Sequence, residues 1–286
     1  MSGRFADAMA IFRSHRKQDL FITMTCNPRW PEIQREMRQK GLSKPPPELC
    51  ARVFKMKLDE LTKDLYEKGV FGQHVAHVHV IEFQKRGLPH AHILLILKSC
   101  DSPKDASMYD RFVSAEIPDP TKSPEHARLH YLVLRHMVHV HKPPCQTDDC
   151  KCKRGFPKKY QSATTDSADS FPQYRRRAPD PDAAARGDFD RTAVYKGRII
   201  TNAYIVPYNP WLLYKYQCHL NVEICTSIKS VKYLFKYVYK GHDRVMYRVG
   251  ASAVHMHVCI RMFTHVHTIV NSYMCLRNRI ESERSS

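Results

Sequence analysis

The chain has 286 residues, a formal net charge of +18 and a pI of about 9.5. Hydrophobic residues make up 43% of it and aromatic residues 10%, a composition typical of a folded protein and not of a disordered one. The excess of Lys and Arg predicts a polyanionic partner, above all nucleic acid, because phosphates that bind these side chains release their condensed counterions.

The sequence predicts neither export nor insertion into a membrane. Residues 1–17 lack an apolar stretch followed by a small-residue cleavage site, and no apolar run approaches the ~20 residues that span a bilayer. Ten cysteines without a signal peptide are expected to be reduced thiols, and a cluster of them to bind a metal. We therefore expect a protein of the cytosol or the nucleus.

Hydrophobic periodicity and turn residues predict alternating helices and strands. Helices are expected over residues 5–12, 31–39, 49–68, 129–140 and 228–240, and strands over 19–25, 75–84, 90–97 and 199–206. Helices around a central hairpin favour an α+β fold, with a central antiparallel sheet flanked by helices.

Composition divides the chain into four parts. Residues 1–160 form the first part of the predicted domain, including the hairpin, and residues 193–243 form the remainder. Between them, residues 161–192 are rich in Ser, Asp, Pro, Ala and Arg, which predicts a flexible insertion or linker. Residues 244–286 form a divergent tail.

Histidines occur in five His-x-His triplets, the first residues of which are His77, His90, His139, His255 and His265. With 17 histidines in the chain, chance alone predicts about one such triplet, so the pattern by itself is weak evidence of a metal site. Without further context, an ordinary surface or core pair is the better explanation of any one of them.

The His90-Ala91-His92 triplet gains weight from its place at the start of the second hairpin strand. Residues two apart on a strand share a face, and a hairpin closed symmetrically about Gly87 places Glu82 opposite His92 and Gln84 opposite His90. Two imidazoles, a carboxylate and an amide then surround one point, a ligand set that suits Mg²⁺ or Mn²⁺. The His77 pair falls on the opposite face.

The predicted helix over 228–240 presents two tyrosines on a basic face. Tyr233 and Tyr237 share that face with Lys229, Lys236 and Lys240, and each tyrosine is followed three residues later by a lysine. Lysines that favour the phenolate would activate tyrosine as a nucleophile and offset charge on a phosphate. A solvated basic face with incidental tyrosines is the alternative.

A cysteine cluster forms a third candidate site. Cys145, Cys150 and Cys152, with His139 or His141, offer the ligands of a Cys₃His zinc site. The C-x₄-C-x-C spacing departs from the usual C-x₂₋₄-C, so free thiols in a loop remain the alternative.

Four segments together resemble the replication-initiator nuclease domain of Helitron transposons, within the His-hydrophobic-His superfamily, whose fold the predicted sheet would share. They are DLFITMTCNPRWPEI (19–33), IEFQKRGLPHAHILL (81–95), VPYNPWLLYKY (206–216) and NVEICTSIKSVKYLFKYVYKG (221–241). The resemblance covers roughly residues 5–243.

The resemblance implies a chemistry for these residues. His90 and His92 would be ligands of Mg²⁺ or Mn²⁺, and Tyr233 and Tyr237 would be paired nucleophiles that cut single-stranded DNA and form a 5′-phosphotyrosine. Related viral initiators carry a carboxylate about eight residues before the first motif histidine, where this chain has Glu82. The process served would be rolling-circle transposition, in the nucleus.

The chain also departs from the full family protein. No G-x-x-x-x-G-K-[ST] phosphate loop occurs, so we expect no helicase activity and no helicase domain in this chain. Single-stranded DNA is the expected partner, with Lys85, Arg86 and Lys229 as contacts. A catalytically inactive DNA-binding remnant of a decayed transposon is the competing interpretation.

Overall fold

The computed structural model describes residues 19–83, 88–139, 145, 151–167 and 171–226, and the backbone of residues 267–270. Its strands are β1 (Leu20–Thr25), β2 (His74–Phe83), β3 (Pro89–Leu97), β4 (Thr192–Tyr195), β5 (Arg198–Thr201), β6 (Leu220–Ile224) and β7 (His267–Val270). Its helices are α2 (Pro31–Gln39), α3 (Pro47–Tyr66), α4 (Ala106–Tyr109), α5 (Pro124–His136) and α6 (Pro210–Tyr216), with short 3₁₀ helices η2 (Ala184–Arg186) and η3 (Asn202–Tyr204).

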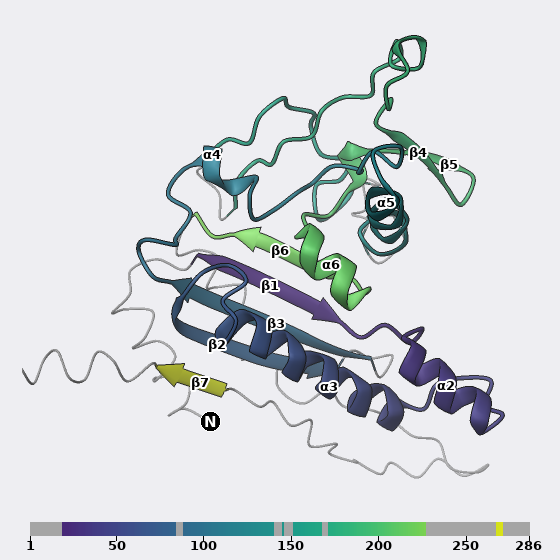
Figure 1. Cartoon of the computed structure of the whole chain (residues 1–286), viewed down its shortest axis with the longest axis vertical. Helices are drawn as coiled ribbons and strands as arrows, with labels where there is room; N and C mark the ends of the chain where they lie inside the picture. Colours follow the sequence, from purple (N-terminus) through teal and green to yellow (C-terminus); the bar gives the residue numbers. More distant parts are fainter. Residues whose placement is uncertain are drawn as a thin grey trace, which may run out of the picture.

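The centre of the fold is an antiparallel sheet with the strand order β6-β1-β3-β2-β7 (Figure 1). The predicted hairpin, β2 and β3, is at its middle, and the first predicted strand, β1, pairs with β3. β7, from the part predicted as a divergent tail, pairs with β2. The prediction of an α+β fold with a central antiparallel sheet is therefore confirmed.

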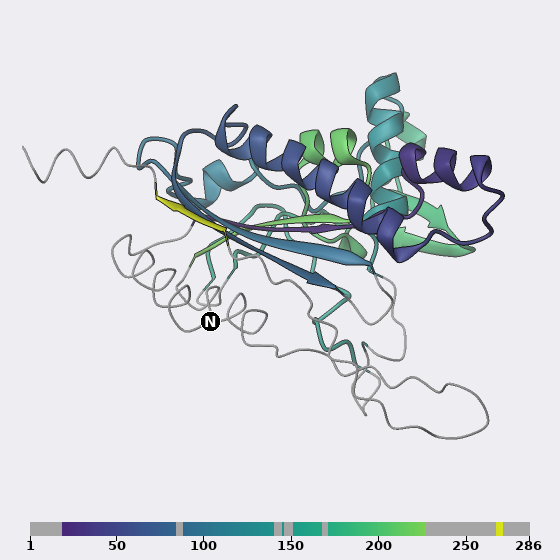
Figure 2. The same cartoon turned by 90° about the horizontal axis from the view of Figure 1, so that it is seen from below.

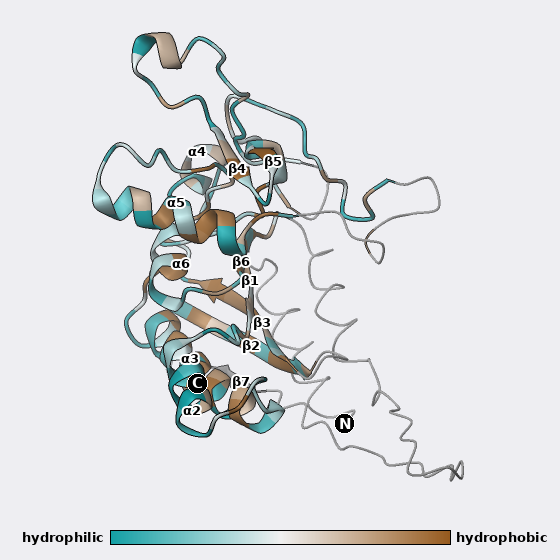
Figure 3. Cartoon of the chain, turned by 90° about the vertical axis from the view of Figure 1, so that its right-hand side faces the viewer, coloured by the Kyte–Doolittle hydropathy of each residue, from teal (hydrophilic) through white to brown (hydrophobic). Residues whose placement is uncertain are grey.

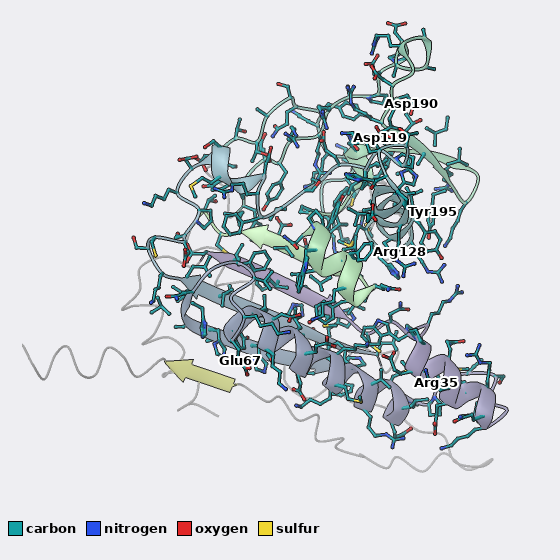
Figure 4. All side chains as sticks on the ribbon, viewed as in Figure 1. Arg35, Glu67, Asp119, Arg128, Asp190 and Tyr195 are labelled. Atoms are coloured by element: carbon teal, nitrogen blue, oxygen red, sulfur yellow. The ribbon has the colours of Figure 1, made fainter. Side chains whose placement is uncertain are left out.

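Helices α2, α3 and α6 lie on the same side of this sheet (Figure 2). The main core forms between them and the sheet, and its fully buried members include Ile22, Ile93, Leu58, Leu61 and Leu212. Figure 3 shows the strands coloured mainly as hydrophobic, whereas exposed charged side chains such as Arg35 on α2, Glu67 after α3 and Arg128 on α5 lie on the helical side (Figure 4). The strands are hydrophobic because both faces of the sheet are buried, one against this helical layer and the other in a second cluster that includes Val78, Val80 and Leu94.

Proline and capping residues set where the helices begin. α2 spans the residues predicted for it, and Pro31 occupies its first turn. α5 starts at Pro124, five residues before its predicted start, because the side chain of Ser123 accepts a hydrogen bond from the backbone N–H of His126. α5 also ends at His136, before its predicted end.

A second layer of the fold surrounds α5, α6 and η3, where Leu132, Val133, Ile205 and Leu213 are buried together. The strand predicted over residues 199–206 is wrong in its second half. β5 ends at Thr201, whose side chain accepts a hydrogen bond from the N–H of Ala203 and so begins the 3₁₀ helix η3.

The segment 161–192, predicted as a flexible insertion, packs against the domain over several of its described residues. Tyr174 and Arg176 are buried, and the guanidinium of Arg176 donates to the backbone carbonyls of Asn202 and Ile205. The neighbouring side chain of Arg177 donates to the buried carboxylate of Glu116. Composition alone did not indicate these contacts.

In the part of the chain that the structure describes, no helix has the length and apolar character that a membrane span requires. The helices predicted over residues 5–12 and 228–240 lie outside the described residues.

Candidate functional site

The predicted metal-binding triplet lies on the central strand β3, and its pairing with β2 differs from the prediction. Glu82 is opposite His90, and Val80 is opposite His92. The predicted pairing of Glu82 with His92 is therefore wrong by two residues. Pro89 joins β3 as its first residue, where its missing N–H is tolerated, and pairs with Phe83.

A shift of two residues keeps every side chain on its predicted face, because the side-chain period of a strand is two. Glu82, His90 and His92 therefore share the face of the sheet opposite to α3. Gln84, expected to join them, lies in the connection outside the described residues. Nε2 of His92 lies 3.6 Å from Oε2 of Glu82, the diagonal contact that this register permits.

Two threonines of β1 orient the two imidazoles. Thr25 is paired with His90 and Thr23 with His92 across the β1–β3 ladder. Oγ1 of Thr25 lies 3.0 Å from Nδ1 of His90, and Oγ1 of Thr23 lies 3.1 Å from Nδ1 of His92. Each histidine is thus hydrogen-bonded through Nδ1, which directs its Nε2 away from β1.

The two Nε2 atoms have different surroundings. Among the described residues, Nε2 of His90 is buried and has no hydrogen-bond partner, whereas Nε2 of His92 faces Glu82. Burial, with the nearby His92 and His219, lowers the pKa of His90 to about 4. A neutral imidazole is the form that binds a metal ion.

The ligand atoms of Glu82, His90 and His92 do not all lie within 4.8 Å of one another in this structure. Within the described ranges, His139, Cys145 and Cys152 do form a group whose ligand atoms all lie within 4.8 Å of one another. Among Glu82, His90 and His92, the close approach is that of the Glu82 carboxylate to Nε2 of His92.

Three further polar residues on β6 and just before it extend this face beyond β1, and sequence reasoning missed them. Asn221 is paired with Thr23, and Glu223 with Phe21, while the carbonyl of His219 accepts a hydrogen bond from the N–H of Thr25. Burial raises the pKa of Glu223 to about 7. Polar residues at every second position of the otherwise apolar stretches FITMT and HLNVEI were the available signal.

The first His-x-His triplet serves packing, as its predicted face requires. His77 and His79 are buried on the α3 side of the sheet, and the ring of His77 stacks on Tyr66 with their centroids 3.6 Å apart. The triplet at His255 lies outside the described residues, as does His265.

The predicted cysteine cluster is brought together in part. Nε2 of His139 lies 3.1 Å from Sγ of Cys145 and 3.3 Å from Sγ of Cys152, and the two sulfur atoms are 3.3 Å apart. These three residues could hold a metal ion. Cys150 and His141, the other predicted ligands, lie outside the described residues.

The predicted nucleophiles and DNA contacts also lie outside the described residues. They are Tyr233, Tyr237, Lys229, Lys236, Lys240, Lys85 and Arg86. Their roles stay predictions from the sequence.

Comparison with known proteins finds a similarity over the first third of the chain. Residues 1–95 match the family model described as the Helitron helicase-like domain at N-terminus. No curated protein matches the chain. The matched residues include β1 and the His90-Ala91-His92 triplet, and the motifs quoted above for residues 206–216 and 221–241 lie beyond the match. Residues 1–95 are therefore similar to a Helitron helicase-like N-terminal domain, a similarity that suggests a transposon-related function.

Proposed function

We propose that this protein is a metal-dependent endonuclease and strand transferase for single-stranded DNA, which acts in rolling-circle transposition in the nucleus. The observation that carries the proposal is the arrangement of the two motif imidazoles. Both are held through Nδ1 by threonines of β1, and Nε2 of His90 is buried and lacks a hydrogen-bond partner among the described residues. A buried polar atom without a partner is costly unless a ligand satisfies it.

The residues on this face fit Mg²⁺ or Mn²⁺. His90 and His92 offer imidazole nitrogens and Glu82 offers a carboxylate oxygen, and mixed nitrogen and oxygen ligands with open positions suit metal ions that assist phosphate chemistry. When bound, the ion would polarise a phosphate oxygen and stabilise the charge that develops on it. This ligand set of nitrogen and oxygen atoms therefore differs from the sulfur ligands of a cysteine site.

In the proposed reaction, the phenol oxygen of Tyr233 or Tyr237 attacks a DNA phosphorus atom. A tyrosine–phosphate bond forms, the bond to the 3′ oxygen breaks, and the departing oxygen takes a proton to become a 3′-hydroxyl. Attack of a 3′-hydroxyl on the phosphotyrosine reverses these steps and joins two strands. Lys236 and Lys240 would favour the phenolate and offset negative charge on the phosphate.

The test is a search for the covalent intermediate. Purified full-length chain is incubated with 5′- and 3′-labelled single-stranded oligonucleotides and Mn²⁺, and the products are separated under denaturing conditions. We expect a protein–DNA adduct that carries the strand on the 3′ side of the cut, requires the metal ion, and does not form with EDTA or with fully double-stranded DNA.

The competing function is that of a DNA-binding module without catalysis. The formal charge of the chain, +18, favours binding of DNA whether or not the nuclease site is active. Salt-dependent binding to oligonucleotides without any adduct, across Mg²⁺, Mn²⁺ and several sequences, would support this function and contradict the nuclease proposal.

The threonines of β1 should tune the affinity for the catalytic metal ion. Thr25→Val removes the hydroxyl that lies against Nδ1 of His90 and keeps the branched shape that suits a strand. We expect the apparent affinity for Mn²⁺, measured by titration of adduct formation and by isothermal calorimetry, to fall about 10- to 100-fold, as losses of such outer contacts typically do.

Thr25→Ser restores the hydroxyl and should recover most of the affinity for Mn²⁺. Thr62, on the exposed side of α3, bonds the carbonyl of Asp59, and Thr62→Val is the matched control. Equal Mn²⁺ affinity in Thr25→Val and the unmodified protein would show that the hydroxyl serves packing of the strand alone.

A further inference from the structure

A group of three soft ligands lies away from the sheet face that carries His90 and His92. Sγ of Cys145, Sγ of Cys152 and Nε2 of His139 form a triangle with sides of 3.1, 3.3 and 3.3 Å. Ligands around a tetrahedral Zn²⁺, ~2.3 Å from sulfur and ~2.0 Å from nitrogen, lie roughly 3.5–3.8 Å apart. The triangle is therefore slightly smaller than one face of a zinc tetrahedron.

The distance between the two sulfur atoms separates this arrangement from a disulfide. No disulfide joins Cys145 to Cys152, because their sulfur atoms lie 3.3 Å apart, well beyond the ~2.05 Å of a disulfide bond. Two thiols and an imidazole within mutual contact form a site for a cation that prefers sulfur and nitrogen. Mg²⁺ and Mn²⁺ prefer oxygen ligands, so the ligand set favours Zn²⁺ over either of them.

The backbone after Cys152 is arranged to support a thiolate. The N–H of Arg154 donates to Sγ of Cys152 at 3.3 Å, and the N–H of Gly155 donates to the carbonyl of Cys152 at 2.8 Å. Gly155 closes this turn with φ of +66°, in the left-handed region that favours glycine. Amide donors to a ligating atom are typical of the outer contacts in metal sites.

The imidazole donor, His139, is fixed to the second layer of the fold. The N–H of His139 donates to the carbonyl of Tyr204 in η3, and its ring stacks on Phe156 with centroids 4.4 Å apart. Farther along, the N–H of Lys158 donates to the carbonyl of Ala203. His139, just after α5, and the segment that follows Cys152 are thus both hydrogen-bonded to η3.

We propose that His139, Cys145 and Cys152 bind a structural Zn²⁺ that fastens the turn at residues 152–155 to α5 and η3. The described residues supply three of the four ligands that a tetrahedral Zn²⁺ takes. Because the site is built from thiolates and lies on a different layer, it is independent of the Mg²⁺ or Mn²⁺ ion of the proposed nuclease.

The zinc ion would also hold a basic turn in place. Lys153 and Arg154 follow Cys152 directly, and both are exposed. With the turn fastened, these two side chains have a fixed base from which to contact phosphates. Loss of the zinc ion should therefore weaken DNA binding without changing the His90 site.

The experiment measures zinc in the full-length chain, purified with a thiol reductant and without affinity tags that bind metals. We expect about one equivalent of Zn²⁺ by elemental analysis, which resists EDTA washing at low concentration but leaves with a strong zinc chelator. Replacement by Co²⁺ should give a thiolate charge-transfer band and intense visible bands, the signature of tetrahedral sulfur coordination.

Variants assign the ligands. Cys145→Ser and Cys152→Ser should each lose most of the zinc, while Cys100→Ser, at an exposed free cysteine, should keep it. His90→Ala should also keep it, which separates this result from the fate of the nuclease proposal.

One further measurement remains informative if the cysteine variants fail to fold. In the unmodified protein, alkylation followed by peptide mapping should show Cys145 and Cys152 protected until zinc is removed, with Cys100 modified at the same rate throughout. Absence of bound zinc in the reduced protein, or equal alkylation of all three thiols with and without it, would overturn the proposal.

Discussion

Replacing His92 by glutamine should lower the yield of the covalent DNA adduct by more than about 100-fold, because it removes a ligand of the metal ion that activates the phosphate. Glutamine keeps a polar side chain of similar reach beside Thr23, so the sheet should still fold. His90→Ala should have the same effect. Affinity for single-stranded DNA should change little in either variant, since contacts between phosphates and basic side chains supply most of the binding.

The matched control for this prediction is His126→Gln. His126 is exposed on the first turn of α5, and its ring lies against the hydroxyl of Ser123. His126 is a histidine like His92, but it lies on a helix and not on the sheet face that carries His90 and His92. Adduct yield is measured on denaturing gels across a Mn²⁺ titration, with circular dichroism as a check on folding. Undiminished adduct in folded His92→Gln would remove this histidine from the metal site.

The hairpin shows why the sequence predicts the face of a strand better than its register. The alternation of side chains is a property of each strand alone, so Glu82, His90 and His92 were assigned to one face correctly. The register depends on where the connection closes, and here Pro89 enters the strand instead of the loop. The shift happened to be even, and an odd one would have separated Glu82 from the two histidines.

Contacts between residues far apart in the chain were beyond prediction from the sequence. Thr25 lies 65 positions before His90, and only the antiparallel pairing of β1 with β3 brings the hydroxyl to the imidazole. Similarly, the burial of Arg176 depends on carbonyls of Asn202 and Ile205, which no local pattern reveals. Composition predicted a polar, mobile segment because it counts the arginine without its partners.

The cysteine cluster illustrates the opposite case, in which spacing argued against a site that three-dimensional contacts support. The C-x₄-C-x-C spacing differs from common zinc motifs, yet the turn at Gly155 and the anchoring of His139 on η3 bring three donors together. The spacing of metal ligands in the sequence therefore depends on the local turns, and more than one spacing can bring the ligand atoms together.

Removal of both predicted nucleophiles should abolish the adduct completely while leaving metal binding intact. Tyr233→Phe combined with Tyr237→Phe keeps both rings and deletes both phenol oxygens, which are the atoms that would form the bond to phosphorus. Each single variant should retain part of the activity, because the remaining tyrosine can still attack. The readout is adduct yield at saturating Mn²⁺, with mass spectrometry of the DNA-linked peptide to identify the attached tyrosine.

Tyr131→Phe provides the comparison, because Tyr131 is exposed on α5 and its ring lies beside the guanidinium of Arg135. It should form the adduct at the level of the unmodified protein. The pattern of losses also separates the two halves of the mechanism. His92→Gln should lower both the adduct yield and the affinity for Mn²⁺, whichever of the two tyrosines is present. The double tyrosine variant should bind Mn²⁺ with normal affinity and should lose adduct formation alone. An adduct in the double variant would mean that another side chain attacks the phosphate, and the lysine spacing around Tyr233 and Tyr237 would then reflect a basic DNA-binding face.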